Sequence, residues 1–386
     1  MKKIKVINKP KKNTLKLLLR SLIKNDAAVE GGRTQPWWIA LVLFFASVII
    51  AIVPTMIQVG QTKGSDVFKG AQYQTDVGLV KFNEALNTSG VDLVYREDIN
   101  NGFVLRNEGV AFETVFTNTI NLSSVTGSTN IPYFSFAQPR TITVTNTSGQ
   151  QVSEVVSFEY LRVYFTGNIT NQFVTNGAPV EPEVALASHL IGLTENSHIV
   201  DPNSAVTSHV ILGKQNLYFR VYNPIKVATG ADYVRSSQGI FTGVKTSLTI
   251  NSFNEETAKG DTILATDRDY VTKVVNNWSN LVDMTYGPVK TITFWTTTLI
   301  NGAIYFVLSV FIGLIYFITT RGKFNPSRDI KFFEAIRIGA WLLPAPALIT
   351  LVVGSFMPSY ASLLYIMTLG MRTVWMSMKS VQPPTK

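Results

Sequence analysis

Histidines and paired carboxylates are the side chains in this chain that could bind a metal or transfer a proton. His189, His198 and His209 each follow a serine, and they lie nine and eleven residues apart. Zinc motifs usually place two histidines four residues apart on one helix face, or combine histidines with cysteines. The spacing here therefore favours ordinary surface or strand positions, and we predict no metal site.

Acidic residues gather at four places, namely Arg96-Glu97-Asp98, Glu181-Pro182-Glu183, Glu255-Glu256 and Asp267-Arg268-Asp269. Two carboxylates could serve a glycosidase or bind calcium, but the Asp-x-Asp-x-Asp-Gly spacing of a calcium loop is missing. The sequence also lacks the phosphate-binding loop, the nucleophile elbow, the His-Glu-x-x-His motif and the dinucleotide-binding glycines. We therefore predict no catalytic residue and no cofactor, and a cell-envelope enzyme is only an alternative.

The composition excludes further classes of site. The chain of 386 residues has no cysteine, which excludes disulfides, cysteine-ligated zinc, iron–sulfur clusters and thiol catalysis. Charged residues make up 15% of the chain, against about 25% in an average soluble domain. Long apolar segments must therefore account for the missing charge, although the formal net charge is +9.

Four apolar segments, at 36–58, 291–319, 335–357 and 360–378, predict transmembrane helices. The 21 uncharged residues from Trp37 to Ile57 would form a helix of about 31 Å, close to the hydrocarbon thickness of about 30 Å. This run is longer than the apolar core of a signal peptide and no small-residue cleavage site follows it, so we expect an uncleaved anchor. The fourth segment is short and contains Arg372.

Charge asymmetry predicts the orientation of these segments. Residues 1–35 carry ten Lys/Arg and two acids, whereas residues 59–290 carry 16 Lys/Arg and 21 acids. The hinge 320–334 and the tail 379–386 are also basic. By the positive-inside rule we expect a multi-pass plasma-membrane protein with both termini and the hinge in the cytoplasm and residues 59–290 outside the cell.

The basic arm, residues 1–35, contains a predicted amphipathic helix from Asn13 to Lys24. Apolar residues recur at helical spacing at Leu15, Leu18, Leu19, Leu22 and Ile23, and basic residues recur every four positions at Lys16, Arg20 and Lys24. This pattern is typical of a helix that lies on a membrane surface, with its cations at anionic lipid headgroups. The arm lacks the interleaved aromatic residues of a nucleic-acid site, so we predict contact with anionic lipid and no nucleic acid.

The segment 59–290 has the composition of a β-rich domain. Residues 140–147, 155–165 and 217–222 alternate and are rich in β-branched and aromatic types, which predicts antiparallel strands. Two helices are expected, one over 65–86 and one over 267–282. The sequence therefore predicts a membrane α-helical bundle of about four transmembrane helices, with a large β-rich (α+β) extracytoplasmic domain inserted between helices 1 and 2.

Polar residues and prolines inside the predicted spans are candidates for an intramembrane function. Asn301 could donate an interhelical hydrogen bond. Pro344 and Pro346 each remove a helix hydrogen bond, so we expect a kink or a short unwound stretch within the third predicted span. We expect Arg372 to snorkel to the cytoplasmic headgroups, with pairing inside the bundle as the alternative.

The order of these elements resembles bacterial maltodextrin-utilisation membrane proteins. The resemblance lies in the short basic helix Leu15–Lys24 before the first span, in an outer domain, and in Lys331–Arg337 as an amphipathic lead-in to a span that contains prolines. It implies an association with sugar uptake and transfers no catalytic residue.

We therefore expect a non-enzymatic accessory or binding protein whose outer domain contacts a ligand, a surface polymer or a partner. A transporter or another membrane protein is a candidate partner. A transport component, argued from the polar and proline residues in the spans, is the first alternative function.

Overall fold

The computed structural model describes residues 13–99, 102–108, 112–125, 127–145, 148–175, 177–197, 207–223, 233–241, 248–253, 267–321 and 328–381. The chain divides into two compact units. The helical unit comprises residues 1–62 and 292–386, and the mixed unit comprises residues 63–291.

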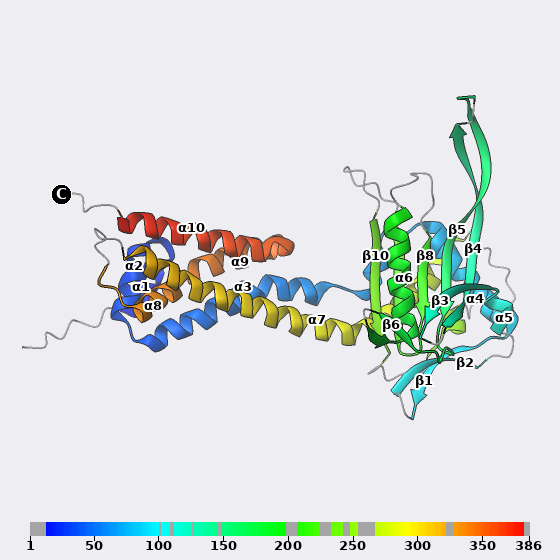
Figure 1. Cartoon of the computed structure of the whole chain (residues 1–386), viewed down its shortest axis with the longest axis horizontal. Helices are drawn as coiled ribbons and strands as arrows, with labels where there is room; N and C mark the ends of the chain where they lie inside the picture. Colours follow the sequence, from blue (N-terminus) through cyan, green and yellow to red (C-terminus); the bar gives the residue numbers. More distant parts are fainter. Residues whose placement is uncertain are drawn as a thin grey trace, which may run out of the picture. The chain divides into compact units, whose positions relative to one another are not determined.

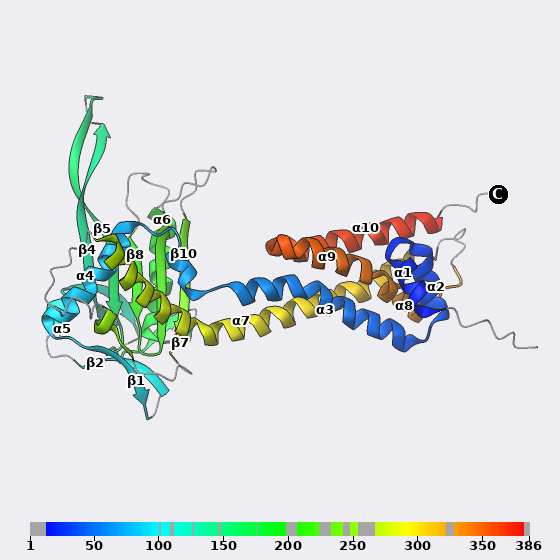
Figure 2. The same ribbon diagram turned by 180° about the vertical axis from the view of Figure 1, so that it is seen from behind.

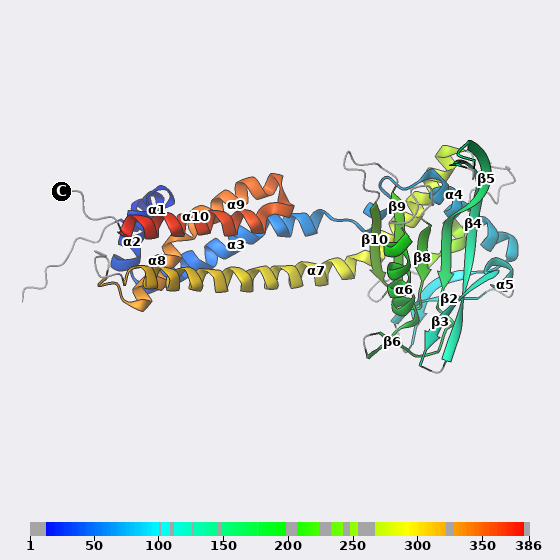
Figure 3. The ribbon, with the colours of Figure 1, turned by 45° about the horizontal axis from the view of Figure 1, so that its top comes forward.

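The helical unit contains helices only among the residues that the structure describes. They are α1 (Thr14–Ile23), α2 (Asn25–Thr34), α3 (Trp37–Gln61), the later part of α7 (Arg268–Thr319), α8 (Phe332–Leu342), α9 (Pro344–Phe356), the short turn η3 (Pro358–Tyr360) and α10 (Ala361–Val381). Helices α3, α7, α9 and α10 lie side by side (Figure 3).

Within the described residues, three helical stretches are long and apolar enough to cross a membrane. They are Trp37–Gln61, the apolar part of Arg268–Thr319, and Phe332–Phe356, which combines α8 and α9. Helix α10 carries Arg372 in its middle and is not one of the three. The first three predicted spans thus coincide with such helices, and the fourth stays a prediction.

The predicted interruption of the third span is confirmed. Helix α8 ends at Leu342 and α9 begins at Pro344, which takes the first position of the new helix. Proline is tolerated there because the first N–H groups of a helix have no intrahelical acceptor.

The mixed unit contains three sheets. In order across each sheet, the largest is β10-β9-β8-β5-β4-β3, the second is β11-β1-β2, and the smallest is β6-β7. Their bounds are β1 Leu93–Asp98, β2 Gly102–Asn107, β3 Asn118–Ser124, β4 Gly127–Thr145, β5 Gln151–Phe165, β6 Phe173–Thr175, β7 Ala178–Val180, β8 Ser208–Leu212, β9 Asn216–Asn223, β10 Tyr233–Ile240 and β11 Leu248–Thr249. The predicted strands at 155–165 and 217–222 fall in β5 and β9, and residues 140–145 of the strand predicted at 140–147 fall in β4, while 146–147 lie outside the described residues.

The prediction of antiparallel strands holds for the pairs β4–β5, β8–β9 and β9–β10, and one pair of the same sheet differs. Strands β5 and β8 pair in parallel, from Leu161 opposite Ser208 to Phe165 opposite Leu212. A parallel pair needs a long crossover, and helix α6 (Pro182–Ser197) lies in the connection between the two strands. The sequence does not predict this helix, because its residues show little amphipathic periodicity.

Helices cover both faces of the six-stranded sheet. On one face Val163, Val210 and Phe219 pack against α4 (Tyr73–Ser89) and the first turns of α7, around the buried Trp278 (Figure 2). On the other face Tyr164 and Ile211 pack against α6 (Figure 1). Alternate residues of β5 and β8 therefore enter two different cores, as the two-residue period of a strand requires.

Both predicted helices of this domain need correction. The segment 65–86 is a short 3₁₀ turn, Gly64–Phe68, followed by α4, which begins only at Tyr73. Gly70, at φ 78°, lies between them in the left-handed region where a helix cannot continue. The helix predicted to end at residue 282 instead continues as α7 to Thr319, and the short helix α5 (Phe112–Val115) was not predicted.

Candidate membrane-surface site

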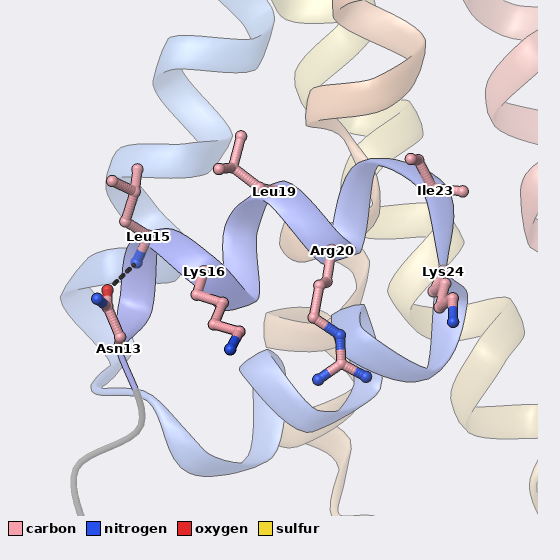
Figure 4. A pocket seen from close by; sticks show the side chains of 7 residues that line it. All are labelled: Asn13, Leu15, Lys16, Leu19, Arg20, Ile23 and Lys24. Carbon is pink, nitrogen blue, oxygen red and sulfur yellow. Dashed lines mark hydrogen bonds between the residues drawn. The ribbon is translucent and has the colours of Figure 1, made fainter.

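Helix α1 presents an apolar and a basic row side by side on its outer face (Figure 4). The Asn13 side chain caps the helix by accepting a hydrogen bond from the Leu15 N–H at 3.1 Å. Leu15, Leu19 and Ile23 are 64%, 57% and 87% exposed. The exposed residues of the second row are Lys16, Arg20 and Lys24. Cations next to an exposed apolar row suit an interface between hydrocarbon and anionic headgroups.

The opposite face of α1 is packed against the rest of the helical unit. Leu17 is buried, and so is Ser21, whose hydroxyl donates to the Leu18 carbonyl at 2.7 Å. Leu18 and Leu22, which the sequence assigned to the lipid-facing stripe, are half-buried. The exposed apolar row is therefore narrower than predicted, because one side of the helix is already used in packing.

Helix α2 attaches this arm to α8. Gly31 and Gly32 lie so close to Trp341 and Ile338 that a Cβ added to either glycine would collide with them. Two glycines in succession are unfavourable for an isolated helix, and here they permit a contact that no larger residue allows. Helix α2 is not predicted by the sequence pattern.

Arg372 joins α10 to the arm and to the end of α8. Its Nε donates to the Asn25 Oδ1 at 2.9 Å, its Nη1 donates to the Leu342 carbonyl at 2.9 Å, and its Nη2 donates to the Ser21 carbonyl. The structure thus pairs the guanidinium inside the helical unit, and its level relative to the headgroups stays a prediction. Pairing inside the bundle, the alternative, is what the structure has.

Pro346 explains why Arg372 is needed at this place. In a continuous helix the Leu342 carbonyl would accept from the N–H of residue 346, but proline has no N–H. The carbonyl that Pro346 leaves without a helical donor is the one to which Arg372 donates. Carbonyls in the last turn of a helix have no intrahelical donor. The Ser21 carbonyl, near the end of α1, accepts from Arg372 for the same reason. Three of the sequence-selected features, the proline pair, the arm and Arg372, therefore meet at one point.

A cavity of about 520 Å³ borders this junction, and Lys24, Pro346, Arg372 and Trp375 are among its lining residues. Asn301 does not take part. Its Nδ2 donates to the Thr297 carbonyl of its own helix at 3.0 Å, so the predicted interhelical hydrogen bond is absent at this residue. Asn301 therefore has a local role in α7 and no part in the junction.

Among the described residues, the histidines and the acidic pairs do not form a site together, and Glu255-Glu256 lies outside these residues. His189 is exposed on α6, His209 is buried in β8, and His198 lies outside the described residues. The prediction of an ordinary strand position therefore holds for His209, although the side chain is buried rather than on the surface. In the described part of the chain, no group of three His, Asp or Glu residues could hold a metal ion.

Comparisons with protein-family models, with curated proteins and with solved structures find no match to this chain. The resemblance to maltodextrin-utilisation membrane proteins therefore stays a prediction.

Proposed function

We propose that this chain is an integral membrane accessory or binding protein whose mixed unit recognises a ligand or partner outside the cytoplasm. The observation that carries the proposal is the order of elements along the chain. Residues 63–291 lie between α3 and the apolar part of α7, two helices that are each long and apolar enough to cross a membrane. A folded domain between two such helices is held at the membrane by both of its ends.

The surface of the helical unit supports a lipid environment. Large apolar side chains are exposed along α3, α7, α9 and α10, among them Phe45, Ile49, Leu299, Val307 and Phe356. Exposed apolar surface of this extent is unfavourable in water and normal in hydrocarbon. Lipid is therefore the solvent that suits this unit.

The charge distribution supports an orientation with both termini inside. The arm and the hinge are basic, and the exposed row Lys16, Arg20 and Lys24 would meet the anionic cytoplasmic headgroups. Two cytoplasmic termini require an even number of crossings, so α10 must be the fourth. In the proposed arrangement Arg372 crosses with its hydrogen-bonding groups already satisfied, which lowers the cost of its burial.

Cysteine labelling tests this topology cleanly, because the natural chain has no cysteine. In intact cells a membrane-impermeant maleimide is expected to label Ser153→Cys in the mixed unit, and to label Asn13→Cys only after the membrane is opened. A cysteine added after Lys386 is likewise expected to be protected. Labelling of that last cysteine in intact cells would contradict the four-span arrangement and favour three spans.

Identification of the partner tests the accessory role. We propose, from the resemblance in sequence order, that the partner belongs to a sugar-uptake system. Affinity purification of the tagged full chain in mild detergent is expected to bring down subunits of a sugar importer in a fixed ratio. Purification of the chain alone, together with unchanged growth on maltodextrin after deletion of its gene, would count against this link.

A further inference from the structure

A groove of about 550 Å³ lies in the helical unit between α3, α7 and α8. Along α3 it is lined by residues that recur at the spacing of one helix face, namely Trp37, Ala40, Leu41, Phe44 and Phe45. One face of α3 therefore forms one wall, and residues of α7 and α8 form the others. Between Trp37 and Phe45 the groove follows α3 for about 12 Å, since a helix rises about 1.5 Å per residue.

Small side chains form the bottom of this groove and large ones form its rim. Ala40, Ser309 and Ala340 are buried, whereas Leu41 and other large residues of the rim are exposed. The Ser309 hydroxyl donates to the Tyr305 carbonyl of its own helix at 2.6 Å, so it needs no partner from the groove. The space therefore suits a slender apolar body such as a lipid acyl chain.

Arg337 is the only charged side chain among the described residues that line the groove. Its Nη2 donates to the neutral carbonyl of Gln35, and its Nε is buried without a hydrogen bond. No described carboxylate forms an ion pair with it, and Glu334 accepts from the Lys331 N–H at 3.1 Å at the start of α8. Residues 328–337 carry three basic and two acidic side chains, so the segment as a whole is positive.

Arg337 lies level with the start of α3. The Gln35 carbonyl, to which it donates, comes shortly before Trp37, the first residue of that helix. Trp37 is exposed, and tryptophan is favoured where hydrocarbon meets the headgroups. In the proposed membrane arrangement the guanidinium is therefore at the level of the lipid phosphates, and the groove leads from it into the hydrocarbon.

We propose that this groove binds one anionic phospholipid of the leaflet in which α3 begins, with the phosphate at Arg337 and an acyl chain between α3, α7 and α8. Basic pockets between transmembrane helices bind anionic headgroups, and a guanidinium pairs well with a phosphate. A transmembrane helix of a partner would fill the apolar groove but would leave Arg337 without an anion. The inference rests on the proposed insertion of the helical unit in a membrane and is independent of what the mixed unit binds.

Native mass spectrometry of the full chain in mild detergent tests the proposal. The probes are phosphatidylglycerol and phosphatidylcholine with the same acyl chains. One phosphatidylglycerol per chain is expected to be retained, at least tenfold more tightly than phosphatidylcholine. Equal retention of the two lipids would overturn the proposal. No retained lipid would also overturn it and would leave a partner helix as the occupant of the groove.

Two variants test the charge. Arg337→Gln is expected to weaken the retention of phosphatidylglycerol at least tenfold. Arg328→Gln makes the same charge change at an exposed position outside the groove and is expected to leave retention unchanged. Equal losses in the two variants would show a general effect of surface charge and would overturn the proposal.

Two further variants test the acyl chain, and they stay informative where Arg337→Gln fails to fold. Leu41→Trp narrows the groove from its rim without changing any charge and is expected to weaken retention at least tenfold. Leu299→Trp makes the same change at an exposed position of α7 outside the groove and is expected to have no effect. Retention that survives Leu41→Trp, or that falls equally in both variants, would overturn the proposal.

The maleimide experiment separates this inference from the proposed function. Labelling that contradicts membrane insertion would overturn both proposals. Labelling as expected, with no selective retention of phosphatidylglycerol, would overturn the lipid site alone.

Discussion

The mixed unit and the helical unit differ in how much aromatic surface they leave exposed. In the mixed unit Trp278 is fully buried, and its Nε1 donates to the Asn83 Oδ1 at 2.9 Å inside the apolar core. In the helical unit Trp341 is buried as well, but Trp37, Trp295 and Trp375 are exposed. Arg372 donates three hydrogen bonds inside this unit.

The difference follows from the solvent that each unit suits. A domain in water gains stability by burying apolar area, at about 25 cal/mol per Å². Helices in hydrocarbon gain little from that term and associate through close packing of small residues and through hydrogen bonds. The helical unit has both, because Gly313 of α7 approaches Gly339 of α8 closely and Arg372 bonds to the ends of α1 and α8.

Trp278→Ala tests the apolar side of this comparison and has the largest expected effect. Removing a fully buried tryptophan should destabilise the mixed unit by about 3 to 5 kcal/mol, because a cavity is left and Asn83 loses its donor. Urea unfolding, monitored by limited proteolysis within residues 63–291, measures the change in the free energy of unfolding. Trp295→Ala, which removes an exposed tryptophan from the same helix, is the control, and an equal loss in both variants would break the comparison.

Arg372→Leu tests the polar side. Loss of the guanidinium leaves the Leu342 and Ser21 carbonyls without their donor and should destabilise the helical unit by about 2 to 4 kcal/mol. Thermal unfolding in detergent, followed by circular dichroism and by proteolysis of the arm, measures it. Arg20→Leu, at an exposed position on α1, should change little.

A double variant sharpens this result. Pro346→Ala restores the N–H that can donate to the Leu342 carbonyl, so it should recover about 1 kcal/mol of the loss in the Arg372→Leu background. The same change in the natural chain should bring no such gain. Strictly additive effects of the two substitutions would show that the arginine does not substitute for the missing helix hydrogen bond.

Asp76→Asn tests how strictly the mixed unit excludes charge. Burial raises the pKa of Asp76 to about 7, from about 3.8 in an unfolded chain. Between these two pKa values the folded unit holds a proton that the unfolded chain has lost. The free energy of unfolding therefore falls as the pH rises from about 4 to 7. Asp76→Asn should match the natural chain near pH 4 and be more stable than the natural chain at pH 7.5.

Urea unfolding at the two pH values measures the effect of Asp76→Asn. Glu84→Gln on the same helix, which removes a carboxylate that pairs with Lys81 at the surface, is the control for the loss of a negative charge. A gain at pH 7.5 that Glu84→Gln reproduced would remove burial as the cause.

The outer face of α1 is expected to show the smallest effect. An environment-sensitive dye on Leu19→Cys should shift to shorter wavelength in vesicles with phosphatidylglycerol relative to vesicles with phosphatidylcholine alone. Changing Lys16, Arg20 and Lys24 to Gln should remove this difference, since each basic residue contributes about 1 kcal/mol at an anionic surface. The same dye on Ser153→Cys should not respond, and a response there would deny a special role to α1.

The pattern of apolar residues along the chain predicted the elements in which that pattern is regular. The apolar run from Trp37 to Ile57 became α3, and the alternating run from Val155 to Phe165 became the end of β5. Helix α6 was not predicted because its sequence lacks a clear polar face, although the sheet covers only one side of it. Helix α2 escaped because Gly31 and Gly32 favour a break in isolation, and only the close approach of Trp341 makes them suitable.

The sequence by itself determined which segments are apolar enough to leave water, where their charges gather, and that Pro344 and Pro346 interrupt a helix. These properties depend on the residue types within one segment. Only the tertiary structure decided that Arg372 meets the carbonyl that Pro346 leaves without a donor, and that Arg337 lines a groove together with Trp37. Such groups are separated by tens to hundreds of residues, and their meeting depends on how helices and strands pack, which no local period records.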